Sequence, residues 1–259
     1  MPTALITGAS GGIGLELARI HASKGDHLVL VARSADKLSA LKKDLEAAQK
    51  ITVHNIAKDL SQPGAAQEVF DETKAAGITV DYLINNAGFG DFGFFHERDW
   101  NKQQQMINLN ITALTHLTHL YLKEMITRRS GRIMNVASTA AFQPGPTMAV
   151  YYATKAYVLH FSEAVNNEVK DKGITVTALC PGATESGFQE AAAMQESRLV
   201  KGRKLPTSKE VAQYGYKAMM AGKPVAVHGL LNSIMAGSVR FMPRNWVVAV
   251  TRKVQDKVG

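Results

Sequence analysis

A glycine-rich turn follows directly on the first apolar run of the sequence and leads into an amphipathic segment. The run is TALIT at residues 3–7, and three glycines with the spacing GxxxGxG follow it. Glycine lets the backbone turn sharply and approach a ligand closely, and the free N–H groups that begin the next helix stabilise a bound phosphate. Strand, turn and helix in this order predict a site for a dinucleotide pyrophosphate. The residues expected there are Gly8, Ser10, Gly12, Ile13 and Gly14.

Short apolar runs alternate with longer amphipathic segments along the chain. The runs include LVLVA, YLIN, RIMNVAS and ITVTAL, and helical periodicity is clearest at about residues 102–129 and 149–171. Runs that are apolar throughout suit parallel strands covered by helices on both faces. We therefore expect an α/β fold of the Rossmann type, with a doubly wound parallel sheet of about seven strands in a single domain over residues 1–259.

Composition and charge exclude several classes of protein. With 46% hydrophobic and 20% charged residues, the chain can bury a sizeable core. The first apolar run is too short for a signal peptide or a membrane span. Cys180 is the only cysteine and lies in an apolar run, so we expect a buried, inert thiol and a reducing, cytoplasmic location. The net charge of +8 comes without a nucleic-acid motif, and neither a nucleic-acid partner nor a metal site is predicted.

The end of the second predicted strand bears on the choice between NADP(H) and NAD(H). NAD-specific enzymes of this fold usually carry an acid here, which binds the ribose 2′-OH. This chain has Ala32 and then Arg33, so no carboxylate repels a 2′-phosphate and a guanidinium is present to bind it. The pattern favours NADP(H), with Ser10 and Lys37 as candidate helpers. In the alternative interpretation, Arg33 is a solvated residue that opens the next helix, and NAD(H) is used.

Five motifs occur in one order along the chain. They are TGASGGIG at 7–14, NNAG at 85–88, Ser138, the YxxxK run from Tyr151 to Lys155, and PG at 181–182. Together they resemble the short-chain dehydrogenase/reductase family, and the glycine spacing is similar to that of its short, single-domain branch. The resemblance implies an oxidoreductase that transfers hydride between NADP(H) and a carbonyl or secondary alcohol, working as a homodimer or homotetramer.

Tyr151 is the expected acid/base group. Its reference pKa near 10 must fall by ~3 units for it to act as a base near neutrality, and a nearby cation favours the phenolate. Residues four apart share a helix face, so Lys155 should lie beside the Tyr151 hydroxyl, whereas Tyr152 points about a third of a turn away. Ser138 ends a predicted strand thirteen residues before Tyr151, so it should lie at the carboxyl edge of the sheet and hold the substrate oxygen.

The family resemblance implies further site residues. It assigns to Asn110 the bending of a helix and the holding of a water that links Lys155 to solvent, with Asn108 as a rival. The chain departs from the family at Ser186, where threonine is common, and Asn85 is as readily a structural residue as a ligand contact. The cofactor contacts that the resemblance implies are Asp59 and Leu60 at the adenine, Asn86, Ala87, Gly88, Tyr151 and Lys155 at the riboses, and Pro181, Gly182 and Thr184 at the nicotinamide.

A long polar stretch interrupts the pattern at about residues 183–206. Such a connection late in an α/β domain is typical of a substrate lid, with a disordered surface loop as the alternative. The side chains that shape the substrate pocket are expected from residues 89–95, 143–148 and 184–203.

The C-terminal segment, at about residues 228–259, is basic and apolar. No acidic residue occurs between residues 211 and 255, where lysines and arginines alternate with large apolar residues. We expect a cap over the substrate cleft or a subunit interface. The alternatives are peripheral docking on an anionic membrane surface, or a site for acidic thioester or lipid substrates. The last of these makes a 3-oxoacyl-thioester or lipid ketone reductase the rival activity. A non-catalytic dinucleotide-binding sensor or scaffold is a rival of another class.

Overall fold

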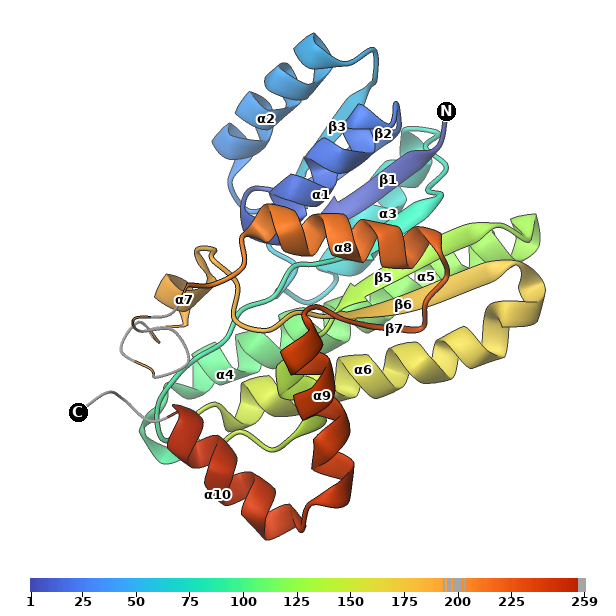
Figure 1. Cartoon of the computed structure of the whole chain (residues 1–259). Helices are drawn as coiled ribbons and strands as arrows, with labels where there is room; N and C mark the ends of the chain where they lie inside the picture. The colour runs from blue at the N-terminus through green and yellow to red at the C-terminus, as the bar shows by residue number, and fades with distance from the viewer. Residues whose placement is uncertain (193, 195–196, 198–201, 203, 256–259) are drawn as a thin grey trace.

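Seven parallel strands form the centre of the fold, in the order β3-β2-β1-β4-β5-β6-β7. The computed structural model describes the chain except for residues 193, 195–196, 198–201, 203 and 256–259 (Figure 1). The strands are β1 (Thr3–Thr7), β2 (His27–Ala32), β3 (Val53–Ala57), β4 (Tyr82–Asn85), β5 (Gly131–Val136), β6 (Ile174–Cys180) and β7 (Val225–Val227). The helices are α1 (Gly12–Ser23), α2 (Ala35–Ala48), α3 (Ala65–Ala75), α4 (Trp100–Ile107), α5 (Leu114–Arg128), α6 (Ala149–Val169), α7 (Phe188–Ala191), α8 (Ser208–Met220), α9 (Leu230–Ser238) and α10 (Arg244–Gln255).

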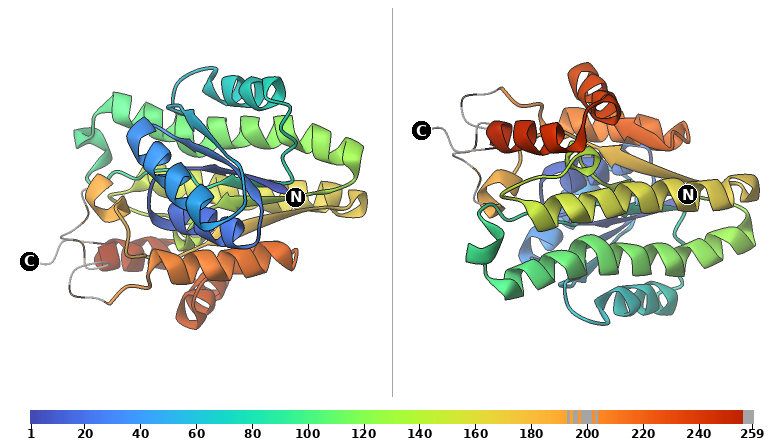
Figure 2. Two further views of the ribbon diagram at one scale, coloured as in Figure 1. Left: turned by 90° about the horizontal axis from the view of Figure 1, so that it is seen from above. Right: turned by 90° about the horizontal axis from the view of Figure 1, so that it is seen from below.

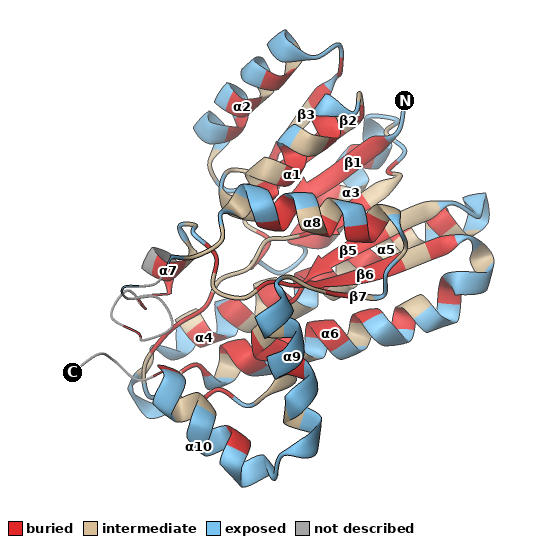
Figure 3. Cartoon of the chain, viewed as in Figure 1, coloured by how far each residue is buried: buried red, intermediate tan, exposed pale blue. Residues whose placement is uncertain are grey.

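Helices cover both faces of the sheet, which confirms the predicted doubly wound α/β fold (Figure 2). Successive side chains of a strand point to opposite faces, so each strand supplies two cores. In β1, Ile6 packs in the core beneath α1, α2 and α8, whereas Leu5 packs in the core beneath α3, α5 and α6. Both side chains are fully buried, and Figure 3 shows the strands buried along most of their length. The apolar runs of the sequence are strands because both faces need apolar side chains.

The strand order reverses between β1 and β4. From β1 the chain builds outward through β2 to β3, and it then returns to build through β4 towards β7 on the other side. The loops that follow β1 and β4 therefore separate at the carboxyl edge of the sheet, and ligands of open α/β sheets bind in the crevice this creates. The fold thus places the glycine-rich turn, which follows β1, beside the NNAG segment, which follows β4.

The predicted helix at 102–129 is two helices joined by a π-helical turn, Asn108–Ala113. One extra residue in such a turn leaves backbone groups free of the regular α-helical pattern, and turns of this kind are frequent at functional sites.

The last two helices stand apart from the layers that cover the sheet (Figures 1 and 2). In α9 only Ala236 is buried, and in α10 only Val247 and Gln255 are. Figure 3 shows both helices as mainly exposed ribbon. Within the described residues, no helix has the length and apolar character needed to cross a bilayer.

Candidate active site

The glycine-rich turn is held closely against the segment that follows β4. Gly8 and Gly12 have φ angles of +68° and +55°, a region that favours glycine. The Asn86 side-chain amide donates to the carbonyl oxygens of Thr7 at 2.9 Å and of Gly8 at 3.3 Å. A Cβ at Gly14 would lie 2.3 Å from the Gly8 carbonyl oxygen. The turn therefore requires glycine at these positions for its own shape.

Helix α1 begins at this turn with no side-chain cap and with no acidic residue in its first turn. Its first N–H groups are therefore left for a ligand, and the positive end of the helix dipole favours an anion there. A Cβ at Gly12 would lie 3.5 Å from the Ser186 Cβ and 3.8 Å from the Ser208 hydroxyl oxygen. The loop after β6 and the start of α8 thus border the same turn. Ser10 and Ile13, also predicted here, are half-buried.

Arg33 lies exposed at the end of β2, next to the buried Ala32. Asp59 accepts hydrogen bonds from the Ser61 backbone N–H at 3.0 Å and from the Ser61 hydroxyl at 2.8 Å. Burial alone would raise the pKa of Asp59, but these bonds and the charge of Arg33 hold it below its usual range. The predicted 2′-phosphate contact and the predicted adenine contact therefore sit close enough to interact electrostatically.

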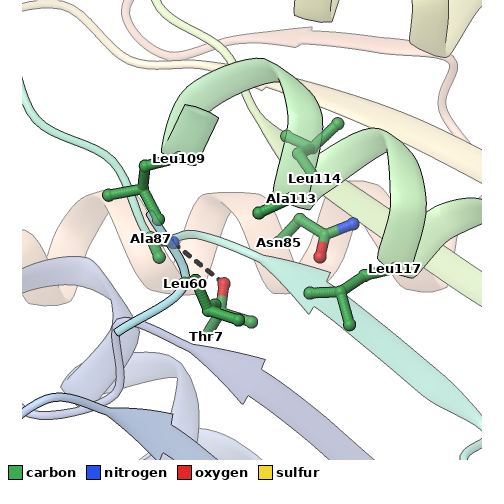
Figure 4. A pocket seen from close by; sticks show the side chains of 8 residues that line it. All are labelled: Thr7, Leu60, Asn85, Ala87, Leu109, Ala113, Leu114 and Leu117. Atoms are coloured by element: carbon green, nitrogen blue, oxygen red, sulfur yellow. Dashed lines mark hydrogen bonds between the residues drawn. The ribbon is translucent and has the colours of Figure 1, made fainter. Parts of the chain in front are cut away.

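A small pocket lies where the carboxyl ends of β1 and β4 meet the first turns of α5 (Figure 4). The backbone N–H of Ala87 donates to the Thr7 hydroxyl oxygen at 3.0 Å across one wall of the pocket. Leu60, the residue predicted beside the adenine, is another wall, whereas Ser138, Tyr151 and Lys155 are not part of the lining. The residues that line the pocket are Thr7, Leu60, Asn85, Ala87, Leu109, Ala113, Leu114 and Leu117.

Asn85 belongs to the core network of the sheet. Its side-chain amide donates to the Thr118 hydroxyl at 3.0 Å and to the Asn135 side-chain oxygen at 2.9 Å. Asn135 in turn donates to the Ser162 hydroxyl at 2.9 Å. These contacts link β4, β5, α5 and α6, so of the two interpretations of Asn85 the structural one fits its surroundings.

The structure brings Ser138, Tyr151 and Lys155 together at the carboxyl edge of β5. Ser138 lies two residues beyond the end of β5 and is close enough to the Tyr151 side chain to lower the Tyr151 pKa. The Lys155 ammonium nitrogen lies 5.8 Å from the centre of the Tyr151 ring and donates to the Val136 carbonyl oxygen at 2.7 Å. All three side chains are at least nine-tenths buried. A substrate oxygen placed between Ser138 and Tyr151 would meet two hydroxyl groups at once.

Burial dominates the ionisation of this group in the protein alone. It raises the pKa of Tyr151 above its usual value, and the neighbouring Ser138 side chain offsets only part of that effect. The predicted fall of the Tyr151 pKa is therefore not found for the chain by itself, because burial is the largest influence on that pKa. Burial also lowers the pKa of Lys155 to about 8. Cys180, buried as expected, has its pKa raised to about 12 for the same reason.

Asn110 lies in the π-helical turn and is buried beside the active-site residues. Its side-chain amide donates to the Phe89 carbonyl oxygen at 3.0 Å and to the Thr154 hydroxyl at 3.1 Å, and its oxygen accepts from the Phe89 N–H at 3.2 Å. A Cβ at Gly88 would lie 3.0 Å from the Asn110 oxygen and 3.4 Å from the Lys155 nitrogen. The rival Asn108 instead donates to the Ser61 carbonyl oxygen. Of the two asparagines, only Asn110 links the loop after β4 to α6.

The loop after β6 lies between Ser138, the start of α9 and the glycine-rich turn. The Pro181 carbonyl oxygen accepts from the Ser138 hydroxyl at 3.4 Å and from the Thr139 N–H at 2.8 Å. The Thr184 hydroxyl donates to the Gly182 carbonyl oxygen at 3.0 Å. A Cβ at Gly182 would lie 2.7 Å from the Asn232 side-chain nitrogen of α9. Of the three residues predicted at the nicotinamide, Pro181 is therefore held by the segment after β5, Gly182 packs against α9, and Thr184 bonds within its own loop.

Apolar side chains from three separate segments enclose Tyr151. Phe92, Met148 and Phe188 pack in one buried cluster with it, and the Phe188 ring centre is 5.3 Å from that of Tyr151. These residues come from the segments predicted to shape the substrate pocket. The Phe92 N–H donates to the Ala192 carbonyl oxygen at 3.0 Å, which joins two of the segments. Part of the predicted lid at 183–206 lies outside the described residues.

Two groups of residues at the site were missed by the sequence reasoning. Tyr152, predicted to point about a third of a turn away from Lys155, is buried in the same apolar cluster, beside Gln255 of α10. The carboxylate of Asp91 is fully buried and binds three side chains of the segment that follows it. These bonds come from Arg98 Nε at 2.8 Å, Arg98 Nη2 at 3.0 Å, Lys102 Nζ at 2.7 Å and Gln103 Nε2 at 2.8 Å. The only signal in the sequence was an aspartate, Asp91, followed within a short stretch by Arg98 and Lys102.

The chain matches one family model and several characterised proteins. Residues 2–197 match the model described as short chain dehydrogenase. The chain is 36% identical over 183 residues to the very-long-chain 3-oxoacyl-CoA reductase-A of Danio rerio, covering 69% of this chain and 56% of that protein. It is 34% identical over 182 residues to the 17-beta-hydroxysteroid dehydrogenase type 3 of Mus musculus, covering 69% and 58%. The chain thus spans little more than half the length of the curated relatives it matches.

Two solved structures share nearly the whole fold. A short-chain dehydrogenase from Sphingobium yanoikuyae in complex with NADPH superposes with a TM-score of 0.82 at 30% identity, covering 94% of this chain and 97% of that chain. The bulky-bulky ketone specific alcohol dehydrogenase from Comamonas testosteroni superposes with a TM-score of 0.80 at 30% identity, covering 93% and 92%.

Proposed function

The chain belongs to the short-chain dehydrogenase family, and we propose from this premise that it is an NADP(H)-dependent oxidoreductase of carbonyl compounds and secondary alcohols. One observation carries the proposal. The Ser138 and Tyr151 side chains lie next to each other, with the Lys155 nitrogen 5.8 Å from the centre of the Tyr151 ring, at the sheet edge where the uncapped start of α1 also lies. A hydroxyl pair and an anion-binding helix end at one edge suit a dinucleotide and an oxygen-bearing substrate.

The residues present fit a nicotinamide dinucleotide. The turn packs too closely at Gly14 for any side chain, so it is tight at the start of α1, and the first N–H groups of α1 are uncapped. These N–H groups would hold the pyrophosphate, Gly88 and Lys155 would meet the nicotinamide ribose, and Thr184 would meet the nicotinamide. When bound, the cofactor supplies or accepts the hydride.

The chain's own residues hold the substrate oxygen in place and transfer one proton to it or from it. Ser138 binds the substrate oxygen and holds it against the Tyr151 hydroxyl. The raised pKa keeps Tyr151 protonated at neutral pH, so this residue is ready to donate its proton to the oxygen of a carbonyl that is being reduced. In the reverse direction Tyr151 must accept a proton, and a cationic Lys155 favours the phenolate that this requires. Because the pKa of Lys155 is about 8, its charge is present below that pH.

The test is a screen of ketones and aldehydes in which NADPH oxidation is followed by absorbance, with two tyrosine variants. Tyr151→Phe should bind NADPH normally and lose turnover by a factor of about 10² or more, because general acid catalysis is removed. Tyr152→Phe is the matched control, since it removes the neighbouring hydroxyl and leaves the proton donor. A Tyr151→Phe enzyme with full turnover would refute the assignment.

The preference for NADP(H) is proposed from Arg33. Ala32 offers no carboxylate, Arg33 is exposed at the end of β2, and the Sphingobium yanoikuyae relative was solved with NADPH. Arg33→Ala should weaken NADPH binding by a factor of about 10 to 100, the effect of losing a charge-assisted hydrogen bond, and should leave NADH binding nearly unchanged. Lys43→Ala removes one positive charge elsewhere and serves as the control. Equal losses for NADPH and NADH in Arg33→Ala would contradict the preference.

A second candidate activity is the reduction of 3-oxoacyl thioesters or lipid ketones. The apolar cluster of Phe92, Met148 and Phe188 around Tyr151 favours a substrate with a large apolar part. The relatives in Danio rerio and Mus musculus carry names for such substrates. Comparing kcat/KM for an acyl thioester with that for the matching free ketone separates the two, and equal values would remove the thioester from the proposal. Tight NADPH binding without turnover of any carbonyl would instead favour a sensor.

A further inference from the structure

Helices α9 and α10 and the turn between them present large apolar side chains to the outside of the molecule. Six of these side chains define what we call the C-terminal apolar surface, and each is at least half exposed. They are Leu230, Leu231, Ile234, Met235, Phe241 and Trp246. Phe241, at the turn, is 90% exposed. Single exposed apolar residues are common in soluble proteins, but several large ones on two consecutive helices and the turn between them indicate an interaction site.

The helical spacing separates this surface from the side of α10 that faces the protein. Val247 and Gln255, the buried residues of α10, lie on one side of the helix. Trp246, Val250 and Lys253 recur at intervals of four and three residues, which places them together on the opposite side. All three are exposed. The outer side of α10 is thus apolar with a basic residue beside it, and the inner side packs against the rest of the protein.

The charged residues within 211–255 have one sign. No aspartate or glutamate occurs between residues 211 and 255, whereas Arg240 and Lys253 are exposed on or next to the surface. In a two-fold contact between copies of the chain, the same patch would meet itself, so these cations would face cations with no carboxylate from residues 211–255 between them. A phospholipid bilayer with anionic headgroups matches both features. Its phosphate headgroups attract the cations, and its acyl chains accommodate the apolar side chains beneath them.

We propose that the C-terminal apolar surface docks the protein on an anionic phospholipid bilayer. Phe241 and Trp246 enter the interface between headgroups and acyl chains, and Arg240 and Lys253 lie at the headgroups. Tryptophan suits this position because its ring is apolar and its N–H is polar. The partner is a lipid surface, and the docking is peripheral.

The inner side of α10 connects this surface to the rim of the active site. The Arg252 guanidinium lies 4.9 Å from the centre of the Phe94 ring, in the segment that encloses Tyr151. Further along α10, the Gln255 carbonyl oxygen accepts from the Ser197 hydroxyl at 2.9 Å. Docking therefore brings the rim of the active site close to the lipid, where an apolar carbonyl compound would dissolve. This consequence rests on the proposed function, whereas the docking itself does not.

Co-sedimentation of the whole chain with vesicles tests the docking. At 0.15 M salt the protein should bind vesicles of phosphatidylcholine with 30% phosphatidylglycerol and should bind pure phosphatidylcholine far more weakly. Arg240→Glu with Lys253→Glu should lower the partition coefficient at least 25-fold, at about five-fold for each basic charge lost. Lys43→Glu with Lys50→Glu makes the same change in net charge on and after α2. This control should stay close to wild type, because charges beyond ~8 Å are screened at this salt.

A tryptophan measurement tests the orientation. Trp100 and Trp246 are the only tryptophans, so Trp100→Phe leaves Trp246 as the sole reporter. Its emission should shift to shorter wavelength on anionic vesicles and should be quenched by lipids brominated on their acyl chains. Absence of binding by the wild type, an equal loss in the Lys43 and Lys50 control, or an unquenched Trp246 would each overturn the proposal. So would a shift from dimer to monomer in the Arg240 and Lys253 variant, measured by light scattering, with vesicle binding unchanged. None of these outcomes depends on turnover, so the docking can fail while the proposed function stands.

Discussion

Gly14→Ala is a substitution of a single methyl group in the glycine-rich turn, and the structure sets its expected effect. The new Cβ would lie 2.3 Å from the Gly8 carbonyl oxygen and 2.5 Å from the Asn86 side-chain nitrogen. Ordinary contact begins at about 3.4 Å, so the methyl group enters the turn by about 1 Å. Neither neighbour can give way easily, because one is backbone and the other is held by hydrogen bonds to Thr7 and Gly8.

Forcing an extra methyl group into a packed site of this kind costs about 1 to 3 kcal/mol. If the same turn binds the pyrophosphate, the strain moves the N–H groups of α1 out of position. Since 1.4 kcal/mol corresponds to a factor of ten, NADPH should bind about 10 to 100 times more weakly.

The assay is NADPH titration by calorimetry, with thermal unfolding of the free protein measured in parallel. Gly11→Ala is the matched control, because Gly11 has an extended backbone and a Cβ there meets nothing within 4 Å. Gly11→Ala should bind NADPH nearly as wild type. A Gly14→Ala protein that loses thermal stability yet binds NADPH with unchanged affinity would show that the dinucleotide lies elsewhere.

Two further substitutions separate stability from activity. Lys155→Met should abolish turnover yet raise the free energy of unfolding at pH 7 by about 1 to 2 kcal/mol, because burial lowers the pKa of Lys155 to about 8 and penalises its charge. This gain in the free energy of unfolding should shrink from pH 8 to pH 10, because over that range the folded protein releases a proton from Lys155 that the unfolded chain keeps. A gain independent of pH would contradict the reasoning. Asp91→Asn should lower the free energy of unfolding at pH 7 by about 2 kcal/mol, because buried Asp91 accepts bonds from Arg98, Lys102 and Gln103. The bound cations hold the pKa of Asp91 below its usual 3.8. The stability that Asp91 contributes is therefore present above about pH 4 and is lost as pH falls below that value. Chemical denaturation at pH 7 and pH 3 should show the stability of the variant approaching that of wild type in acid.

Local spacing accounts for most of what could be predicted. The apolar runs became strands and the glycine-rich turn became a tight turn before α1, because period and backbone conformation are properties of neighbouring residues. The position of Tyr151 one helical turn before Lys155 follows from the helix period in the same way. The assignment of Asn110 in preference to Asn108 came from a resemblance, and the contacts with Phe89 and Thr154 show what distinguishes the two.

Contacts between distant segments could not be read from the sequence. Tyr152 was predicted to point about a third of a turn away from Lys155, and α10 brings Gln255 against it from more than one hundred residues further along the chain. The cluster of apolar side chains around Tyr151 likewise combines Phe92, Met148 and Phe188. No periodicity connects these residues, since their proximity depends on how loops at one edge of the sheet pack together.

The sequence by itself determined the class of the sheet, the place of the dinucleotide turn and the identity of the three residues at the carboxyl edge of β5. Only the tertiary structure decided how those residues ionise. A charge one helical turn away favours a phenolate, but burial opposes it, and the outcome depends on how much of the side chain the rest of the protein covers. In this chain burial outweighs the charge, because Lys155 donates to Val136 and Tyr151 is enclosed by apolar side chains.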